Sequence, residues 1–112
     1  MEARTKVKNI PFSRSLDLVK LVAYRPGRVV NRAILKNDRL SITLYAFGRG
    51  DGFDTYAASG DSLVQVLDGD VFFNIGGKEI TCGPGQMVAI PADVPHTLTA
   101  IKRSKVILTL IR

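Results

Sequence analysis

The sequence predicts an all-β domain that closes into a small barrel, and three observations lead to this fold class. Short runs rich in β-forming residues, about eight of them, follow one another from residue 29 onward. Glycine, proline, asparagine and aspartate separate these runs as turn signals. No helical pattern lies between them, so they do not fit a parallel sheet, which needs crossover helices. A chain of 112 residues is long enough for one domain with one modest core.

Residues 1–28 are predicted to form an N-terminal arm in front of the barrel. Residues 1–14 are polar and contain an Ile-Pro turn signal, so we expect an extended chain there. Residues 15–22 fit helical spacing and also strand alternation, and Ser15 as a cap favours a short helix. An Arg-Pro-Gly turn follows at 25–27.

The predicted barrel, residues 29–112, consists of strands joined by tight turns. Three alternating glycines at 48–52 predict a flexible loop at the mouth of the barrel. Gly76 and Gly77 form a two-residue hairpin signal, and Pro91 ends a strand because it has no N–H to donate. The expected strands occupy residues 29–36, 40–47, 63–67, 71–75, 78–81, 87–90, 97–100 and 106–111.

The net charge of +6 is concentrated in the first third of the chain. Residues 1–39 carry ten Lys or Arg against three acidic residues, whereas residues 40–112 carry six against seven. The cations are scattered, with no compact run and no interleaved aromatic residues. We therefore favour a solvated basic face over binding to nucleic acid.

The single cysteine, Cys82, excludes an internal disulfide framework and fits a reducing compartment. It has no histidine or basic neighbour nearby in sequence, so we expect a plain buried or turn thiol and not a nucleophile. No apolar run is long enough to span a bilayer, and no apolar segment follows the basic start as a secretory signal would require. A cytoplasmic protein without a membrane partner is expected.

Two sequence motifs lie in the same order and at the same separation as those of the cupin superfamily. The first ends in Val66-Leu67-Asp68-Gly69-Asp70 and is followed by the hairpin Ile75-Gly76-Gly77-Lys78; the second comprises Gly83-Pro84-Gly85-Gln86 and Ile90-Pro91-Ala92-Asp93-Val94-Pro95-His96. The chain therefore resembles a small single-domain cupin. This resemblance implies a double-stranded β-helix, or jelly-roll barrel, across about residues 29–112.

The resemblance also implies where a metal would bind, and this sequence departs from that pattern. Cupin metal sites use two histidines one residue apart, then an acidic residue or histidine, and the histidine of the second motif. Here those positions fall on Tyr56, Ala58, Ser62 and His96. Three of the four are poor ligands, so we expect no metal and no other cofactor. Asp54, on the loop before the strand, and Asp61, on its opposite face, leave a non-standard site open.

The same four residues are candidates for a ligand pocket. Tyr56 and Ala58 are two apart and share a strand face; with Ser62 and His96 they would place a phenol, a hydroxyl and an imidazole among apolar walls. His96 could equally be a hydrogen-bonded structural residue, and the barrel could be filled by its own side chains. No residue is assigned a catalytic role, because no nucleophile can be paired with His96.

Our hypothesis is a metal-free cupin-like domain that binds or senses a small molecule, or that serves as a structural homodimer. The resemblance implies homodimers in which N-terminal strands pack on the partner, and covering a free strand edge would favour this. The alternative is a cupin-type enzyme, either a metal-dependent dioxygenase, isomerase or decarboxylase, or a metal-independent one with acid/base catalysis by His96 and Tyr56, similar to sugar epimerases. We lean against an enzyme and rank nucleic-acid binding last.

Overall fold

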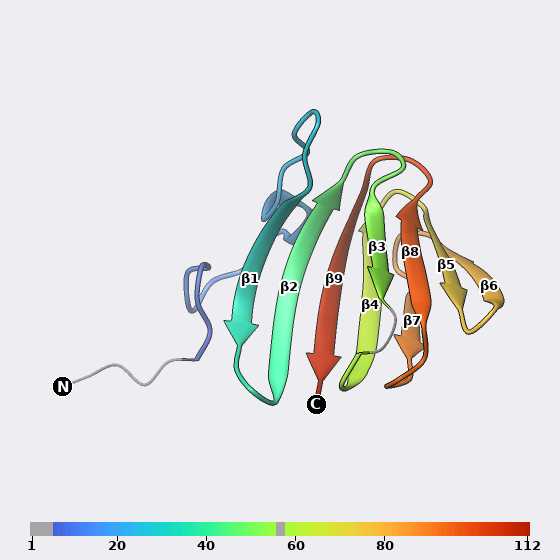
Figure 1. Cartoon of the computed structure of the whole chain (residues 1–112). Helices are drawn as coiled ribbons and strands as arrows, with labels where there is room; N and C mark the ends of the chain where they lie inside the picture. Colours follow the sequence, from blue (N-terminus) through green and yellow to red (C-terminus); the bar gives the residue numbers. More distant parts are fainter. Residues whose placement is uncertain (1–5, 56–57) are drawn as a thin grey trace.

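The computed structural model describes residues 6–55 and 58–112, and these form two antiparallel sheets that face each other (Figure 1). One sheet has the strand order β1-β2-β9-β4-β7 and the other β3-β8-β5-β6. The all-β barrel prediction is confirmed. The strands are β1 (Val30–Lys36), β2 (Leu40–Phe47), β3 (Gly52–Thr55), β4 (Asp61–Asp68), β5 (Val71–Ile75), β6 (Lys78–Cys82), β7 (Met87–Ile90), β8 (His96–Ala100) and β9 (Ser104–Ile111).

The core lies between the two sheets and follows from alternation along each strand. In β4, Ser62, Val64 and Val66 are buried, whereas Asp61 before them and Gln65 between the two valines are exposed. Aromatic rings on the inner face pack edge to face and offset, which favours a fixed core. The buried cluster comprises Phe47, Val64, Val66, Val71, Phe73, Cys82, Ile90, Leu98, Ala100 and Val106.

A strand that the sequence did not predict is β3, in the segment expected to be a loop. The turn covers only Gly48 to Asp51, and the chain pairs with β8 from Gly52 onward, so Asp54 lies on a strand. Gly52 is depleted in strands in general, which explains the missed element. Here its backbone lies so close to Leu98 that a Cβ would overlap the Leu98 carbonyl. The glycine is therefore required by packing, and not by flexibility.

Of the short helix expected over residues 15–22, the structure has a single 3-10 turn at Leu18–Lys20. Asp17, and not Ser15, precedes this turn, and its side chain makes no capping hydrogen bond. Leu18 is exposed, so a longer helix would have no apolar face to bury at that point. Among the described residues, no helix is long and apolar enough to cross a membrane.

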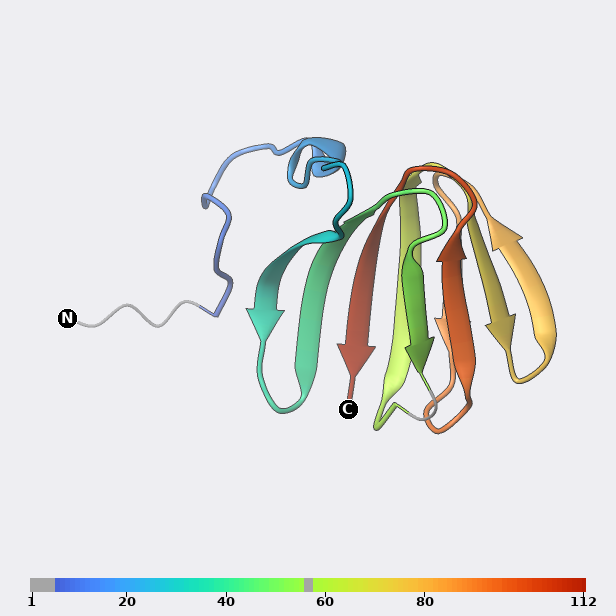
Figure 2. The same cartoon turned by 45° about the horizontal axis from the view of Figure 1, so that its top comes forward.

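The arm packs against the outer face of the five-stranded sheet. Val22 is only 4% exposed and packs with Leu44 and Ala46, which form a second, smaller core. Earlier in the arm, the Lys8 N–H donates to the Ile34 carbonyl oxygen at 2.8 Å, beside the edge of β1. Figures 1 and 2 show the arm running outside β1 and then folding over the upper end of the sheet.

The two sheets differ in width, and this leaves one face uncovered. In Figure 1, β3 and β8 of the four-stranded sheet lie in front of β4 and β7, whereas β1 and β2 lie to one side of it. On the inner face of this extension, Ala33 pairs with Thr43 and Asn31 pairs with Tyr45, whose ring packs against Phe53. The sandwich is therefore open at the side formed by β1 and β2.

Candidate functional site

Three of the four predicted pocket residues lie around one cavity inside the barrel. Ser62 on β4, His96 at the start of β8 and Ala58 between β3 and β4 line a space of about 150 Å³. The fourth, Tyr56, lies outside the described residues. The remaining wall is mostly apolar and consists of Phe53, Thr55, Val64, Ile90, Leu98, Leu108 and Leu110. Strand alternation on β3, β4, β8 and β9 turns these side chains toward the same interior.

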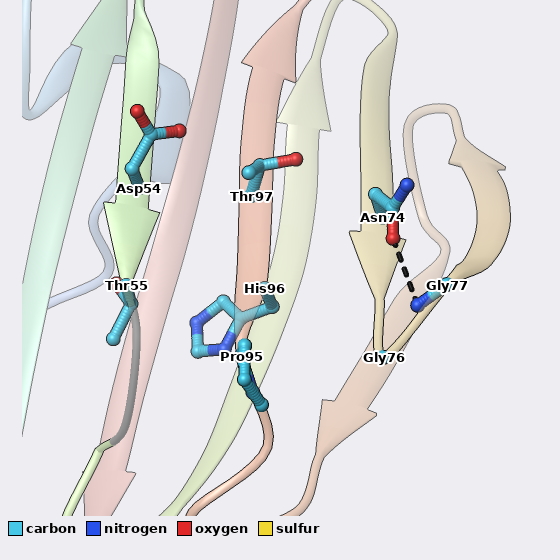
Figure 3. A pocket seen from close by; sticks show the side chains of 8 residues that line it. All are labelled: Asp54, Thr55, Asn74, Gly76, Gly77, Pro95, His96 and Thr97. Atoms are coloured by element: carbon cyan, nitrogen blue, oxygen red, sulfur yellow. Dashed lines mark hydrogen bonds between the residues drawn. The ribbon is translucent and has the colours of Figure 1, made fainter.

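His96 is held in a defined orientation at one end of this cavity. It is paired with Thr55 on β3 and with Ile75 on β5. Its Nδ1 lies 3.0 Å from the Val94 carbonyl oxygen, which can only accept, so Nδ1 carries a proton and donates it. In the neutral ring, Nε2 is then the nitrogen that accepts a hydrogen bond. Figure 3 shows the imidazole directed from β8 toward Thr55.

A second, larger hollow of about 600 Å³ lies on the outer face of the same sheet and shares Thr55 and His96 with the cavity. A polar row crosses three strands there, because Thr97 on β8 pairs with Asp54 on one side and Asn74 on the other. The Asn74 side-chain oxygen accepts a hydrogen bond from the Gly77 N–H at 3.0 Å (Figure 3). A polar groove and an apolar cavity therefore meet at His96.

The cavity volume limits what can enter it. A space of 150 Å³ equals the liquid volume of about five water molecules. That is well below the roughly 300 Å³ at which pockets for drug-sized ligands begin. A ligand that enters the barrel is therefore very small, or places only one end inside with the remainder in the outer groove.

The side chains around the cavity do not fit a divalent metal. Of the residues described there, His96 offers one imidazole, Ser62 a neutral hydroxyl and Ala58 a methyl group. Asp54 lies on the outer face in register with Thr97, and Asp61 accepts a hydrogen bond from the Ala92 N–H at 2.8 Å. Across residues 6–55 and 58–112, no three His, Cys, Asp or Glu side chains gather as a metal site would require. We derive no metal chemistry from this site.

The remaining candidate nucleophile, Cys82, ends β6 within the main core. Burial raises the pKa of its thiol above the ordinary value, so the thiol stays protonated near neutral pH. This environment matches the plain buried thiol that the sequence predicted. It leaves His96 as the one group near the cavity, among the described residues, that is suited to proton transfer.

Two facing antiparallel sheets with a histidine-bounded cavity at one end define the class of small jelly-roll barrels. Residues 47–111 match the family model described as the cupin domain, and the chain belongs to this family. No curated protein matches the chain.

Solved structures give the same fold over nearly the whole chain. A conserved protein of unknown function from Streptococcus pyogenes has a TM-score of 0.95 and 24% identity, covering 99% of this chain and 97% of that one. A cupin superfamily protein from Desulfitobacterium hafniense has a TM-score of 0.89 and 26% identity, covering 96% and 98%. A cupin 2 conserved barrel domain protein from Leptotrichia buccalis has a TM-score of 0.81 and 30% identity, covering 87% of this chain and 47% of that one.

Proposed function

We propose that this cupin binds a small molecule, without a metal, in the cavity bounded by His96. The observation that carries the proposal is that Ala58, Ser62 and His96 line one cavity whose other walls are mostly apolar. Binding sites for small molecules commonly combine apolar walls with a few placed polar groups. The buried, free thiol of Cys82 supports the expected cytoplasmic location.

The geometry favours a ligand with a small apolar end and a hydrogen-bond donor beside it. The apolar end would fill the 150 Å³ cavity between β4 and β8. His96 Nε2 would accept from the donor, since Nδ1 is engaged by Val94. The polar part would continue along the outer groove past Asp54 and Thr97.

A fragment screen by protein NMR tests this proposal. We expect hits that shift the methyl signals of Leu108 and Leu110 inside the cavity. We expect His96→Gln to lower the affinity for these fragments roughly tenfold. Lys78→Gln, at the exposed start of β6, is the matched control and should leave binding unchanged. If no fragment reaches these leucines, or if His96→Gln has no effect, the proposed pocket is wrong.

Elemental analysis of the purified protein after dialysis tests the metal-free part separately. We expect no stoichiometric transition metal, because the cupin motifs assign ligand positions to Ala58 and Ser62, whose methyl and hydroxyl groups bind such metals poorly. One equivalent of iron, manganese, zinc or nickel would contradict this.

The fixed orientation of His96 also suits the alternative hypothesis of an enzyme, namely metal-independent acid/base catalysis with Tyr56. Its Nε2 is positioned to take a proton from a bound molecule, as a general base does. Any ligand found in the cavity should therefore be followed over time by NMR. Unchanged ligand supports binding alone, whereas turnover that His96→Gln abolishes supports the enzyme.

We also propose that the protein forms a homodimer. The inner face of β1 and β2 extends past the second sheet, and Phe12 in the arm is 56% exposed. A second copy would cover both, as isologous dimers commonly do. Light scattering after size-exclusion chromatography at low and high concentration should give twice the chain mass; a monomer at both concentrations rejects the dimer.

A further inference from the structure

The end of the barrel opposite His96 gathers cations around one tyrosine. We call it the Tyr24 pocket; it has a volume of about 390 Å³ and is lined by Tyr24, Arg49, Asp68, Gly69, Lys102 and Arg103. These residues come from the arm and from the β2–β3, β4–β5 and β8–β9 turns. Because β8 runs from His96 to Ala100, the pocket lies a strand length of about 15 Å from His96.

The three turns are fixed to one another by hydrogen bonds. The buried Ser104 hydroxyl accepts from the Asp70 N–H at 3.1 Å and donates to the Lys102 carbonyl oxygen at 2.7 Å. This joins the β4–β5 turn to the β8–β9 turn. The Gly50 N–H donates to the Ala100 carbonyl oxygen at 2.8 Å and adds the β2–β3 turn. The backbone of the turns that carry these cations is therefore fixed, which lowers the entropy cost of binding a ligand there.

Tyr24 connects the arm to this base and orients two of the cations. Its hydroxyl donates to a carboxylate oxygen of Asp68 at 2.6 Å. The Arg103 guanidinium carbon and the Lys105 ammonium nitrogen each lie 4.7 Å from the centre of its ring. Stacking on a ring leaves the edge N–H groups of a guanidinium free to donate to another molecule.

The carboxylates around the Tyr24 pocket offset only part of its positive charge. Arg49, Lys102 and Arg103 line it against the single carboxylate of Asp68. Lys102 forms an ion pair with Asp70 at 3.4 Å. In the described part of the chain, neither arginine has a carboxylate within ion-pair distance. Arg49, Lys102 and Arg103 are exposed, so water screens their mutual repulsion, and an anion between them would be attracted to all three.

We propose that the Tyr24 pocket binds a phosphate-type dianion, either free phosphate or the phosphate group of a small metabolite. Guanidinium groups bind phosphate oxygens through paired hydrogen bonds, and an ammonium group adds a point charge. The 390 Å³ volume equals about thirteen water molecules, so there is room for an organic group beside the phosphate. The site uses neither His96 nor the barrel cavity and is independent of the function proposed above.

Titration of the full chain followed by ¹H–¹⁵N NMR tests this inference. The probes are inorganic phosphate and glycerol 3-phosphate, with sodium chloride at matched ionic strength as the blank. We expect both or one of the phosphates to give saturable shifts of the Gly69 and Arg103 amides with no shift at His96. The probe that binds more tightly shows whether free phosphate or a phosphate monoester is the preferred source.

Three variants decide whether the arginines form the site. Arg103→Gln and Arg49→Gln should each weaken phosphate binding roughly tenfold, because each removes a charge-assisted hydrogen bond. Lys78→Gln removes the same charge from the other end of the barrel and should not change it. Arg49 does not contact the Tyr24 ring, so it keeps the test valid if Arg103→Gln loosens the arm.

The proposal is overturned by either of two results. Amide shifts that follow ionic strength equally in chloride and phosphate would show general screening. A loss of phosphate binding in Lys78→Gln as large as that in Arg49→Gln would show that net charge, and not the pocket, attracts the anion.

Discussion

The two ends of the barrel differ in their side chains: one end has the His96 cavity, and the other has the cationic Tyr24 pocket. At the His96 end, Ala58 and Ser62 line a mostly apolar cavity beside a single imidazole. The Tyr24 end carries Arg49 and Arg103 on rigid turns. The comparison teaches that the family motif and the cluster of charged side chains lie at different ends of the same barrel, so the fold alone does not locate the chemistry.

Gly69 gives the largest expected effect, because it belongs to the first cupin motif and forms part of the Tyr24 end. Its φ of 86° is left-handed, and a Cβ there would overlap the Ser104 hydroxyl and the Arg103 carbonyl. We expect Gly69→Ala to lower the free energy of unfolding by about 3 kcal/mol. Urea unfolding followed by circular dichroism measures this.

Gly50→Ala is the matched control for that substitution. Gly50 has the same φ of 86°, but a Cβ there would meet nothing within 4 Å. Only backbone strain is then added, and the expected loss is about 1 kcal/mol. Equal losses at Gly50 and Gly69 would contradict a steric role for the motif glycine.

The arm should contribute to the stability of the Tyr24 end. Val22→Ala removes two methyl groups from the core formed with Leu44 and Ala46, and we expect a loss of about 2 kcal/mol. Val19→Ala, at a side chain that is 40% exposed, should change stability by less than about 0.5 kcal/mol. If both variants unfold like the parent protein, the arm is not packed as described.

Tyr24→Phe keeps the ring but removes its hydrogen bond to Asp68, with an expected loss of about 1 kcal/mol. Burial, the bond to Asp68 and the Asp68 charge raise the pKa of Tyr24 above 10.0, against the opposing charge of Arg103. The folded state thus holds this proton more tightly than the unfolded state. The resulting stabilisation is complete below about pH 10 and is lost as the pH rises further.

Urea unfolding at about pH 8 and about pH 11 measures this pH dependence. The parent protein should lose more stability over that interval than Tyr24→Phe. The other two raised pKa values, those of Tyr45 and Cys82, are present in both proteins and cancel in the difference. An identical loss in both proteins would show that Tyr24 does not contribute.

The smallest effect is expected at Lys102, whose ion pair with Asp70 is exposed. Its side chain is 65% exposed and that of Asp70 is 42% exposed, so solvent screens the attraction. Lys102→Gln should change the free energy of unfolding by less than about 0.5 kcal/mol. A larger loss in urea unfolding would mean that this cation serves stability more than binding.

Much of the fold could be predicted because turn residues and alternating strands are local signals. The strand with Ser62, Val64 and Val66 and the hairpin at Gly76 and Gly77 both follow from short windows of sequence. The pairing of Gly52 with β8 could not be predicted in this way, because it depends on a close approach to Leu98, 46 residues later. The same reason explains why Val22 was not recognised as a core residue.

The two candidate sites differ in the same way, because one has a local sequence motif and the other depends on long-range contacts. His96, Ser62 and Ala58 were found through their spacing from family motifs, although Tyr56 lies outside the described residues. The Tyr24 pocket has no motif, since Tyr24 and Arg103 meet only after folding. Long-range contacts of this kind become visible only in three dimensions, so the residues of the Tyr24 pocket could not be predicted as a group from the sequence.

The single cysteine provides a way to measure how often the core of this protein opens. Cys82 ends β6 inside the main core, and only the deprotonated, accessible sulfur reacts with alkylating reagents. Each modification event therefore records an opening of the core that exposes Cys82, either local or global. The labelling rate, followed by mass spectrometry, reports how often such openings occur.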